Sequence, residues 1–383
     1  MPKSNTNLLL KAVFTITLLA SLPLAFAQIG PGRLQLANRW VSASEKEKSD
    51  LTLNNWLDAD YRYKNWTAGL RFEIHQPHNA AVYNDNLTQR YLEYQNDWLK
   101  IRAGNFYERL GRGLVFHAFE IQNQTLDRTS QHVAIDRNID GVNAKISLSN
   151  LEVTGIWGRP LQMLSSARSD ALGGGEVKLR PISGLMVGGT YVRIGTQDFF
   201  NNDFTVSVSS LQTGFNLGAV DFYGEVAQKI SSRTQAEKDG DAVYLSANFS
   251  GAWLGVSAEF KRYKNFAQPF NNPPALVKTH SFTLLNRHTH ALNADDERGY
   301  QIESYISPNS ATTLTLHVSG AGNLAGARRY RFREIFVESR NEWSGKITSR
   351  VLLDQSEDHI VTRRDGARPP LKLIFCSTPK TAC

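Results

Sequence analysis

The sequence predicts an all-β protein, an antiparallel transmembrane β-barrel of porin-like type with about 16–18 strands. Three observations predict it. The chain begins with a secretory leader, continues as runs in which apolar and polar residues alternate, and has no second apolar segment long enough to span a membrane as a helix. Alternation at every second residue gives a strand with one apolar and one polar face. Exported strands of this kind are typical of outer-membrane barrels, whose apolar face contacts lipid.

Residues 1–27 have the three parts of a signal peptide. Lys3 and Lys11 supply positive charge, an apolar stretch runs from Ala12 to Leu24, and residues 25–27 form an A-x-A cleavage site. The apolar stretch is shorter than the roughly 18 residues that a membrane-spanning helix needs. We therefore expect a cleaved leader and export to the outer membrane.

Composition suits a barrel and argues against several other classes. Hydrophobic residues make up 41% of the 383-residue chain, as expected where only alternate residues face lipid, although a soluble β-protein has a similar average. The net charge of +7 is spread along the predicted strands, so we expect contact with outer-membrane lipid and none with nucleic acid. Both cysteines, Cys376 and Cys383, lie at the end of the chain, which excludes a disulfide framework in its body.

The first predicted hairpin consists of two alternating runs, residues 51–63 and 66–75, joined by a turn at Lys64-Asn65. Each run has about the ten residues that a tilted strand needs to cross the hydrocarbon layer. The same pattern predicts further hairpins, pairing 142–148 with 151–157, 211–217 with 220–230, 243–249 with 253–262, 301–306 with 313–318 and 330–338 with 346–354. Short and long connections alternate, as periplasmic turns and outer loops do.

Two segments interrupt the alternation. Residues 264–298 contain Pro269, Pro273 and Pro274, so we expect an outer loop or a loop folded into the lumen. Beyond about Arg364 the alternation stops. We expect the barrel to occupy residues 28–365 and residues 366–383 to form a disordered or out-of-frame tail. Because an unpaired strand edge in lipid is costly, this also predicts a C-terminally truncated barrel.

The segment from Ile101 to Glu120, IRAGNFYERLGRGLVFHAFE, resembles the signature of an uncharacterised outer-membrane β-barrel family from Gram-negative bacteria. In that family a G-N-F-Y-E strand end leads into a G-x-G-L turn. Residues 139–142, Ile-Asp-Gly-Val, resemble the family's L-D-G-V, and residues 281–288, 299–302 and 334–343 resemble later segments. The resemblance covers about residues 33–360. It implies a barrel that normally continues for several more strands, and it implies no activity or catalytic residues.

Seven charged side chains are candidates to line the lumen or a constriction: Arg71, Arg90, Lys100, Arg102, Glu108, Arg109 and Arg112. Basic residues facing a lumen favour anions. The alternative is a polar lumen whose arginines are neutralised by Glu73, Glu93 and Glu108. The flanking glycines, Gly104, Gly111 and Gly113, either relieve crowding at a tight bend or position Glu108, Arg109 and Arg112 at a constriction.

Two functions fit these patterns. The first is a porin-like channel for small polar solutes, including anions. The second is a non-transporting structural or accessory barrel in outer-membrane assembly, secretion or surface attachment. A soluble β-sandwich or adhesin is a third class. The sequence predicts no enzyme, because no nucleophile motif accompanies the serines and histidines, and no cofactor. His280, His288 and His290 lie in the long segment with the acidic residues 295–297. His288-x-His290 can offer two imidazoles to zinc or copper, and the acidic cluster can offer oxygens to calcium, but neither spacing is a strong motif, so we expect a solvated loop and no metal.

Overall fold

The computed structural model describes residues 31–379, apart from residues 45–50, 77–83, 122–134, 162–169, 198–201, 233–238, 269, 275, 277–294, 324–330, 345–346 and 359–371. The expected signal peptide and the three loop histidines, His280, His288 and His290, lie outside the described residues. In the described part of the chain, no helix is long and apolar enough to cross a membrane.

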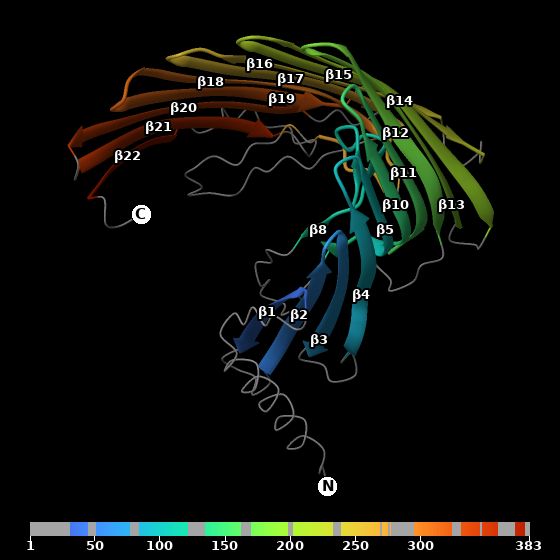
Figure 1. Ribbon diagram of the computed structural model, residues 1–383. Helices are drawn as coiled ribbons and strands as arrows, with labels where there is room; N and C mark the ends of the chain where they lie inside the picture. The colour runs from blue at the N-terminus through green and yellow to red at the C-terminus, as the bar shows by residue number, and fades with distance from the viewer. Residues whose placement is uncertain are drawn as a thin grey trace. The chain divides into compact units, whose positions relative to one another are not determined.

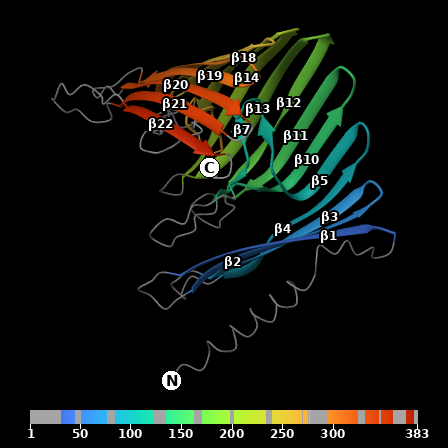
Figure 2. The same cartoon turned by 90° about the vertical axis from the view of Figure 1, so that its left-hand side faces the viewer.

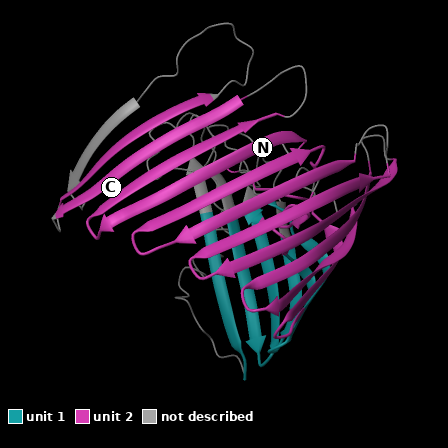
Figure 3. Ribbon diagram, turned by 90° about the horizontal axis from the view of Figure 1, so that it is seen from above, with its two compact units in different colours: residues 1–106, 120–145 teal, residues 107–119, 146–383 magenta. Residues whose placement is uncertain are grey.

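The chain forms two compact units, which Figure 3 colours separately. Unit 1 comprises residues 1–106 and 120–145, and unit 2 comprises residues 107–119 and 146–383. The short segment 107–119 therefore leaves the first unit in mid-sequence and packs with the second.

Unit 1 consists of antiparallel strands in which each of the first four pairs with the next one in sequence (Figures 1 and 2). Its strands are β1 (Arg33–Ser44), β2 (Leu51–Tyr63), β3 (Trp66–Gln76), β4 (Asn84–Gln95), β5 (Leu99–Phe106), the short β8 (Glu120–Ile121) and β9 (Ile135–Asp136), and most of β10 (Ile139–Ser147). Strand β5 pairs with β10, and β8 pairs with β9.

Unit 2 continues the next-neighbour pattern from β11 to β22, and Figure 3 shows its long strands side by side. These strands are β11 (Leu151–Pro160), β12 (Ala171–Ile182), β13 (Leu185–Gln197), β14 (Asp203–Leu217), β15 (Val220–Ser231), β16 (Gly240–Ser250), β17 (Leu254–Lys264), β18 (Asp296–Asn309), β19 (Thr312–Gly322), β20 (Arg331–Ser344), β21 (Ile347–Asp358) and β22 (Lys372–Pro379). The short strands β6 (Arg109–Leu110) and β7 (Phe116–His117) form a separate pair.

Of the strands that the structure describes, 18 have the antiparallel sheet pairing. This confirms the predicted all-β antiparallel class and its strand number. Short and long connections alternate along the chain, as predicted. The longest connections between strands of this sheet are residues 107–138 and 265–295.

The predicted hairpins are confirmed, and their turns follow from local sequence. Strands β2 and β3 pair from Leu53↔Gln76 to Tyr63↔Trp66, and Lys64 takes a left-handed φ of 50° at the turn. The turn of the predicted hairpin between residues 301–306 and 313–318 differs from its prediction. Strand β18 continues through Pro308 to Asn309, and its register with β19 shifts between Ile306 and Asn309. This register shift accommodates Pro308, because a proline has no backbone N–H to donate to the hydrogen bonds between strands.

The sheet of unit 2 has its polarity reversed relative to a soluble protein. Large apolar side chains on alternate positions are exposed, among them Leu211, Leu217, Val226, Ile230 and Ile302. Charged and amide side chains on the other face are buried, among them Glu176, Gln212, Glu225, Lys261, Glu297, Gln301, Glu303, Glu334 and Glu338. We call these the apolar face and the polar face.

The end of the chain differs from the expected irregular tail. Residues 372–379 form strand β22, which pairs antiparallel with β21 from Ile347↔Pro379 to Asp354↔Lys372. A sheet edge presents a row of unpaired backbone groups, and these accept another strand whether or not its side chains alternate. The loss of alternation after Arg364 therefore did not predict the backbone conformation of this segment.

Candidate functional site

The polar face of unit 2 carries a folded hairpin, residues 107–119, which we call the inner loop. Its two short strands pair through Arg109↔His117 and Leu110↔Phe116, and the amide of Ala118 donates to the carbonyl of Glu108 at 2.8 Å. Three of the seven predicted site residues, Glu108, Arg109 and Arg112, belong to this loop. The other four lie in unit 1.

Two carboxylates of the strand wall hold the tip of the inner loop. The amide of Gly111 donates to Glu176 Oε1 at 2.8 Å, and the amide of Arg112 donates to Glu225 Oε2 at 3.1 Å. Glu176 belongs to β12 and Glu225 to β15. Hydrogen bonds to ionised acceptors are about twice as strong as neutral ones, so these successive amides fix the loop on the sheet.

Further bonds occupy both carboxylates. Glu176 also accepts from Gln212 Nε2 at 2.6 Å and pairs with Lys178 Nζ at 2.5 Å. Glu225 accepts from Ser210 Oγ at 2.9 Å and from Tyr223 Oη at 2.7 Å, and it is only 1% exposed. Each carboxylate is therefore satisfied within the wall and the loop.

The glycines of the signature segment make this contact possible. Gly111 has a φ of 62° and Gly113 a φ of 85°, in the left-handed region that residues with a β-carbon rarely adopt. A β-carbon at Gly111 would collide with the Glu225 carboxylate, and one at Gly113 would lie 2.8 Å from the carbonyl oxygen of Asn272. The glycines therefore permit the tight bend that was considered from the sequence, and this bend places Arg112 beside the wall. A constriction formed by Glu108, Arg109 and Arg112 stays a prediction.

A second segment covers the inner loop. We call the described residues 266–268, 270–274 and 276 the inner strap; they belong to the long irregular segment predicted from its prolines. The amide of His117 donates to the carbonyl of Phe270 at 2.9 Å, and the amide of Asn272 donates to that of Gly113 at 3.0 Å. Gln268 Nε2 donates to the carbonyl of Val115 at 2.7 Å. Of the two predictions for this segment, the described part fits folding onto the polar face.

Both the inner loop and the inner strap bury apolar side chains: Leu110, Leu114, Val115, Phe116, Phe266, Phe270 and Leu276. The wall also holds the strap, since Lys229 Nζ donates to the carbonyl of Ala267 and Tyr263 Oη to that of Pro274, both at 2.9 Å. The two segments therefore form a fixed structure on the polar face.

Arg109 and Arg112 project from this structure with exposed side chains. Neither forms an ion pair with an acidic residue in the described part of the chain. The Arg112 guanidinium lies 4.6 Å from the centre of the Tyr223 ring, a cation–π contact that orients it without neutralising it. Glu108 is half-buried, and its Oε1 accepts the amide of Arg109 at 3.1 Å.

Three of the four candidates in unit 1 form close ion pairs, unlike Arg109 and Arg112. Arg71 Nε pairs with Asp58 and its Nη1 with Glu120, both at 2.6 Å. Glu93 pairs with Arg102 at 2.6 Å and with Lys100 at 3.3 Å. These pairings neutralise Arg71, Lys100 and Arg102. Glu93 is one of the three acidic partners expected from the sequence, whereas Asp58 and Glu120 were not expected.

Arg90 differs from the other unit 1 candidates. Its side chain is 67% exposed, and its guanidinium lies 3.9 Å from Asp140. At this distance and exposure the interaction is weak. Of the seven candidates, Arg90, Arg109 and Arg112 thus keep the most available positive charge.

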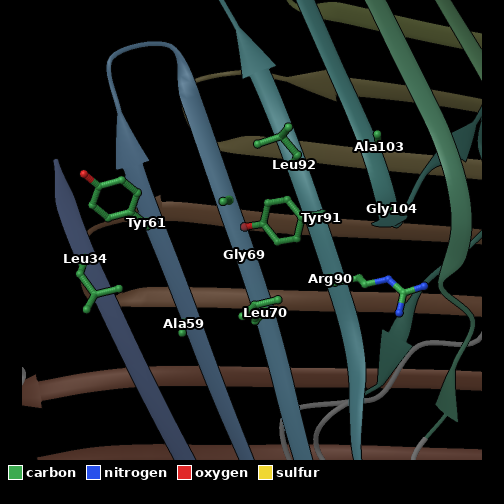
Figure 4. Close-up of a pocket in the computed structure, with 11 residues that line it drawn as sticks. Leu34, Ala59, Tyr61, Gly69, Leu70, Arg90, Tyr91, Leu92, Ala103 and Gly104 are labelled. Carbon is green, nitrogen blue, oxygen red and sulfur yellow. The ribbon is translucent and has the colours of Figure 1, made fainter.

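An apolar hollow of about 570 Å³ lies in unit 1 (Figure 4). Its lining includes Leu34, Ala59, Ala68, Leu70, Leu92 and Ala103. The Tyr91 ring lies against Gly69, where a β-carbon would collide with it, and Tyr91 Oη donates to Asp60 at 2.6 Å. Arg90 is the one charged residue among those that line the hollow. The inner loop instead brings several charged and polar groups together, so it is the candidate site.

Three polar-face residues with contacts at or near the site were not predicted from the sequence. Glu225 accepts the Arg112 amide, Tyr223 lies under the Arg112 guanidinium, and Glu259 accepts a hydrogen bond from Tyr244. Tyr223 and Glu225 belong to β15, and Glu259 belongs to β17. Their alternating positions mark them as polar-face residues, but nothing in the local pattern distinguishes them from other such residues. Their selection depends on the inner loop, which lies more than 100 positions earlier; Arg112 and Glu225 are separated by 113.

Comparisons with known proteins place the chain in a family. A family model described as "Family of unknown function (DUF6029)" matches residues 31–362, which confirms the resemblance to an uncharacterised family. No curated protein matches the chain.

Solved structures with low identity also match. Pseudomonas aeruginosa OccD3 (OpdP) is 12% identical with a TM-score of 0.49, covering 91% of both chains. P. aeruginosa OccK5 (OpdH) is 12% identical with a TM-score of 0.47, covering 91% of this chain and 96% of its own. A BenF-like porin from Pseudomonas fluorescens Pf-5 is 10% identical with a TM-score of 0.47, covering 93% and 99%.

Proposed function

Because the chain belongs to the DUF6029 family, whose function is unknown, we propose its function from its own geometry. It is an outer-membrane channel of porin-like type that passes small polar solutes, and the arginines of its inner loop attract anionic groups.

The reversed polarity of the sheet carries this proposal. On β14, Leu211 is 70% exposed while its neighbour Gln212 is 5% exposed. Soluble proteins rarely expose contiguous apolar surface of this kind. Transmembrane barrel strands place apolar residues toward lipid and polar residues toward the interior. The long strands of unit 2, such as β14 with 15 residues and β18 with 14, exceed the 9–11 or so that a tilted strand needs to cross the hydrocarbon layer.

The inner loop supports a solute path that favours anionic groups. Positive side chains at a pore raise the local concentration of anions. Arg109 and Arg112 are exposed, whereas the carboxylates nearest to the loop tip, Glu176 and Glu225, are occupied by loop amides and wall donors. The positive charges of the loop therefore remain exposed, whereas the carboxylates of the wall are occupied by hydrogen bonds.

One observation favours the second candidate, a structural or accessory barrel. The inner loop and inner strap, which are joined by backbone hydrogen bonds, carry fully buried apolar side chains, among them Leu110, Leu114, Phe116 and Phe266. Such packing on the polar face reduces the space for solutes. Under this alternative the same arginines would be surface charges without a permeant.

Conductance separates the two candidates. The protein purified from outer membranes is inserted into planar lipid bilayers, and single-channel current and the chloride-to-potassium permeability ratio are measured. The channel proposal expects discrete conductance, and it expects Arg109→Ala with Arg112→Ala to lower the ratio by about threefold or more. Arg340→Ala, which removes an exposed arginine paired with Glu342, should leave the ratio unchanged.

Three outcomes would contradict parts of this proposal. A folded protein without conductance above the lipid background would favour the structural barrel. Conductance with an unchanged permeability ratio in the double variant would remove the role of the arginines. Recovery of the native protein in a soluble fraction would contradict both candidates.

A further inference from the structure

Most charged groups around the inner loop already have partners. Lys261 and Glu297 form an ion pair in which both side chains are 0% exposed. Glu176 pairs with Lys178, and Glu225 accepts hydrogen bonds from the loop and the wall. Three charges differ from these within the described residues: the guanidinium groups of Arg109 and Arg112 and the carboxylate of Glu259. Of the two arginines, Arg112 is the one held over a ring of the wall.

Glu259 lies on the polar face of β17 and is partly exposed. Its Oε2 accepts a hydrogen bond from Tyr244 Oη at 2.9 Å. Within the residues that the structure describes, neither Glu259 nor Arg112 forms an ion pair. A neutral hydroxyl orients the Glu259 carboxylate without compensating its charge, as the Tyr223 ring orients Arg112.

Two tyrosines connect these charges. The Arg112 guanidinium lies over Tyr223, the centroids of the Tyr223 and Tyr244 rings are 6.2 Å apart, and Tyr244 binds Glu259. This series of contacts runs across β15, β16 and β17. It places an available cation and an available anion at opposite ends of an aromatic surface.

The register sets the separation between the backbone positions of Tyr223, over which the Arg112 guanidinium lies, and Glu259. Tyr223 pairs with Ser246, and Ser246 pairs with Glu259, so Tyr223 and Glu259 lie in one cross-strand row, two strands apart. Two interstrand spacings amount to about 10 Å. The ammonium and carboxylate of a single α-amino acid are carried by the same carbon and cannot span this row. A tripeptide, whose extended length is also about 10 Å, can do so.

We propose that Arg112 and Glu259 form a dipolar binding site for short zwitterionic peptides. The peptide carboxylate pairs with Arg112, its ammonium pairs with Glu259, and its backbone lies on Tyr223 and Tyr244. This inference rests on the proposed channel function and specifies its substrate class: the anionic group attracted by the loop belongs to a solute that also carries a cation.

Binding by the purified full-length protein in detergent tests the site without requiring conductance. Isothermal titration calorimetry compares triglycine with N-acetyl-triglycine, which keeps only the carboxylate, and triglycine amide, which keeps only the ammonium. Triglycine should bind about fivefold more tightly than either analogue, because each lacks one partly screened ion pair.

Two variants should give opposite patterns. Arg112→Ala should weaken triglycine and N-acetyl-triglycine by about fivefold and leave triglycine amide unchanged. Glu259→Gln should weaken triglycine and triglycine amide and leave N-acetyl-triglycine unchanged. Arg340→Ala and Glu342→Gln remove an exposed pair of the same residue types in β20 and should leave all three affinities unchanged.

The proposal is overturned if triglycine binds no more tightly than both analogues, or if the two variants affect all three peptides alike. Block of single-channel current by triglycine then tests transport. Selective binding by a protein without conductance would support the peptide-binding site and contradict the channel function. Conductance without selective binding would support the channel function and contradict the peptide-binding site.

Discussion

Gly111 lies so close to Glu225 that a β-carbon at position 111 would collide with the Glu225 carboxylate. The same carboxylate accepts the amide of the next residue, Arg112, at 3.1 Å. The small size of glycine therefore allows a strand of the wall to hold the loop tip, and this contact positions Arg112 over Tyr223.

Gly111→Ala should destabilise the protein by about 1–3 kcal/mol, because it combines a left-handed φ with a steric collision. Gly218→Ala is the matched control, since Gly218 has a φ of 60° but no atom within 4 Å of the position that a β-carbon would occupy. Urea unfolding of both variants measures the difference. Equal destabilisation would show that conformational strain alone, and not the contact with Glu225, requires glycine at position 111.

Lys261→Met should destabilise the fold by about 3–5 kcal/mol, because it leaves the charge of Glu297 buried without its ion-pair partner. Both side chains of the pair are 0% exposed. The double variant Lys261→Met with Glu297→Leu should recover much of this loss, since it removes both charges. Denaturant unfolding of the two single variants and the double variant measures the coupling. Additive losses would be inconsistent with a direct interaction between the two residues.

Leu211→Arg should destabilise the protein in a lipid bilayer by about 2–4 kcal/mol, because it moves a charge to a surface that contacts hydrocarbon. Asp221→Arg introduces the same side chain near the β14–β15 turn and should cost much less. Unfolding from phospholipid vesicles measures both. An unchanged free energy of unfolding for Leu211→Arg is the result expected if this face contacts water.

The strands were largely predictable because side-chain alternation is a local property. Residues 51–63 and 66–75 alternate in sequence, and β2 and β3 occupy nearly the same ranges. Strand β22 was not predicted, because its pairing depends on the free edge of β21 and not on its own side chains.

The site was predictable only in part. The glycine pattern indicated a special bend near Arg109 and Arg112, and the structure places both on the inner loop. The neutralisation of Arg71 by Asp58 and Glu120 required tertiary contacts. The role of Glu259 also required tertiary contacts. Its position relative to Arg112 depends on the strand register and on the path of a loop that is far away in sequence.

Spin labelling in bilayers tests the central claim, that one face of the sheet contacts lipid. After Cys376→Ser and Cys383→Ser, labels are attached singly at Leu211 and Phe215 on the apolar face and at Ser210 and Gln212 on the polar face. Electron paramagnetic resonance then compares collision with oxygen, which concentrates in lipid, and with a water-soluble nickel chelate. We predict high oxygen and low nickel accessibility at 211 and 215 only. High nickel accessibility at 211 and 215 in correctly folded, vesicle-bound protein would contradict the account.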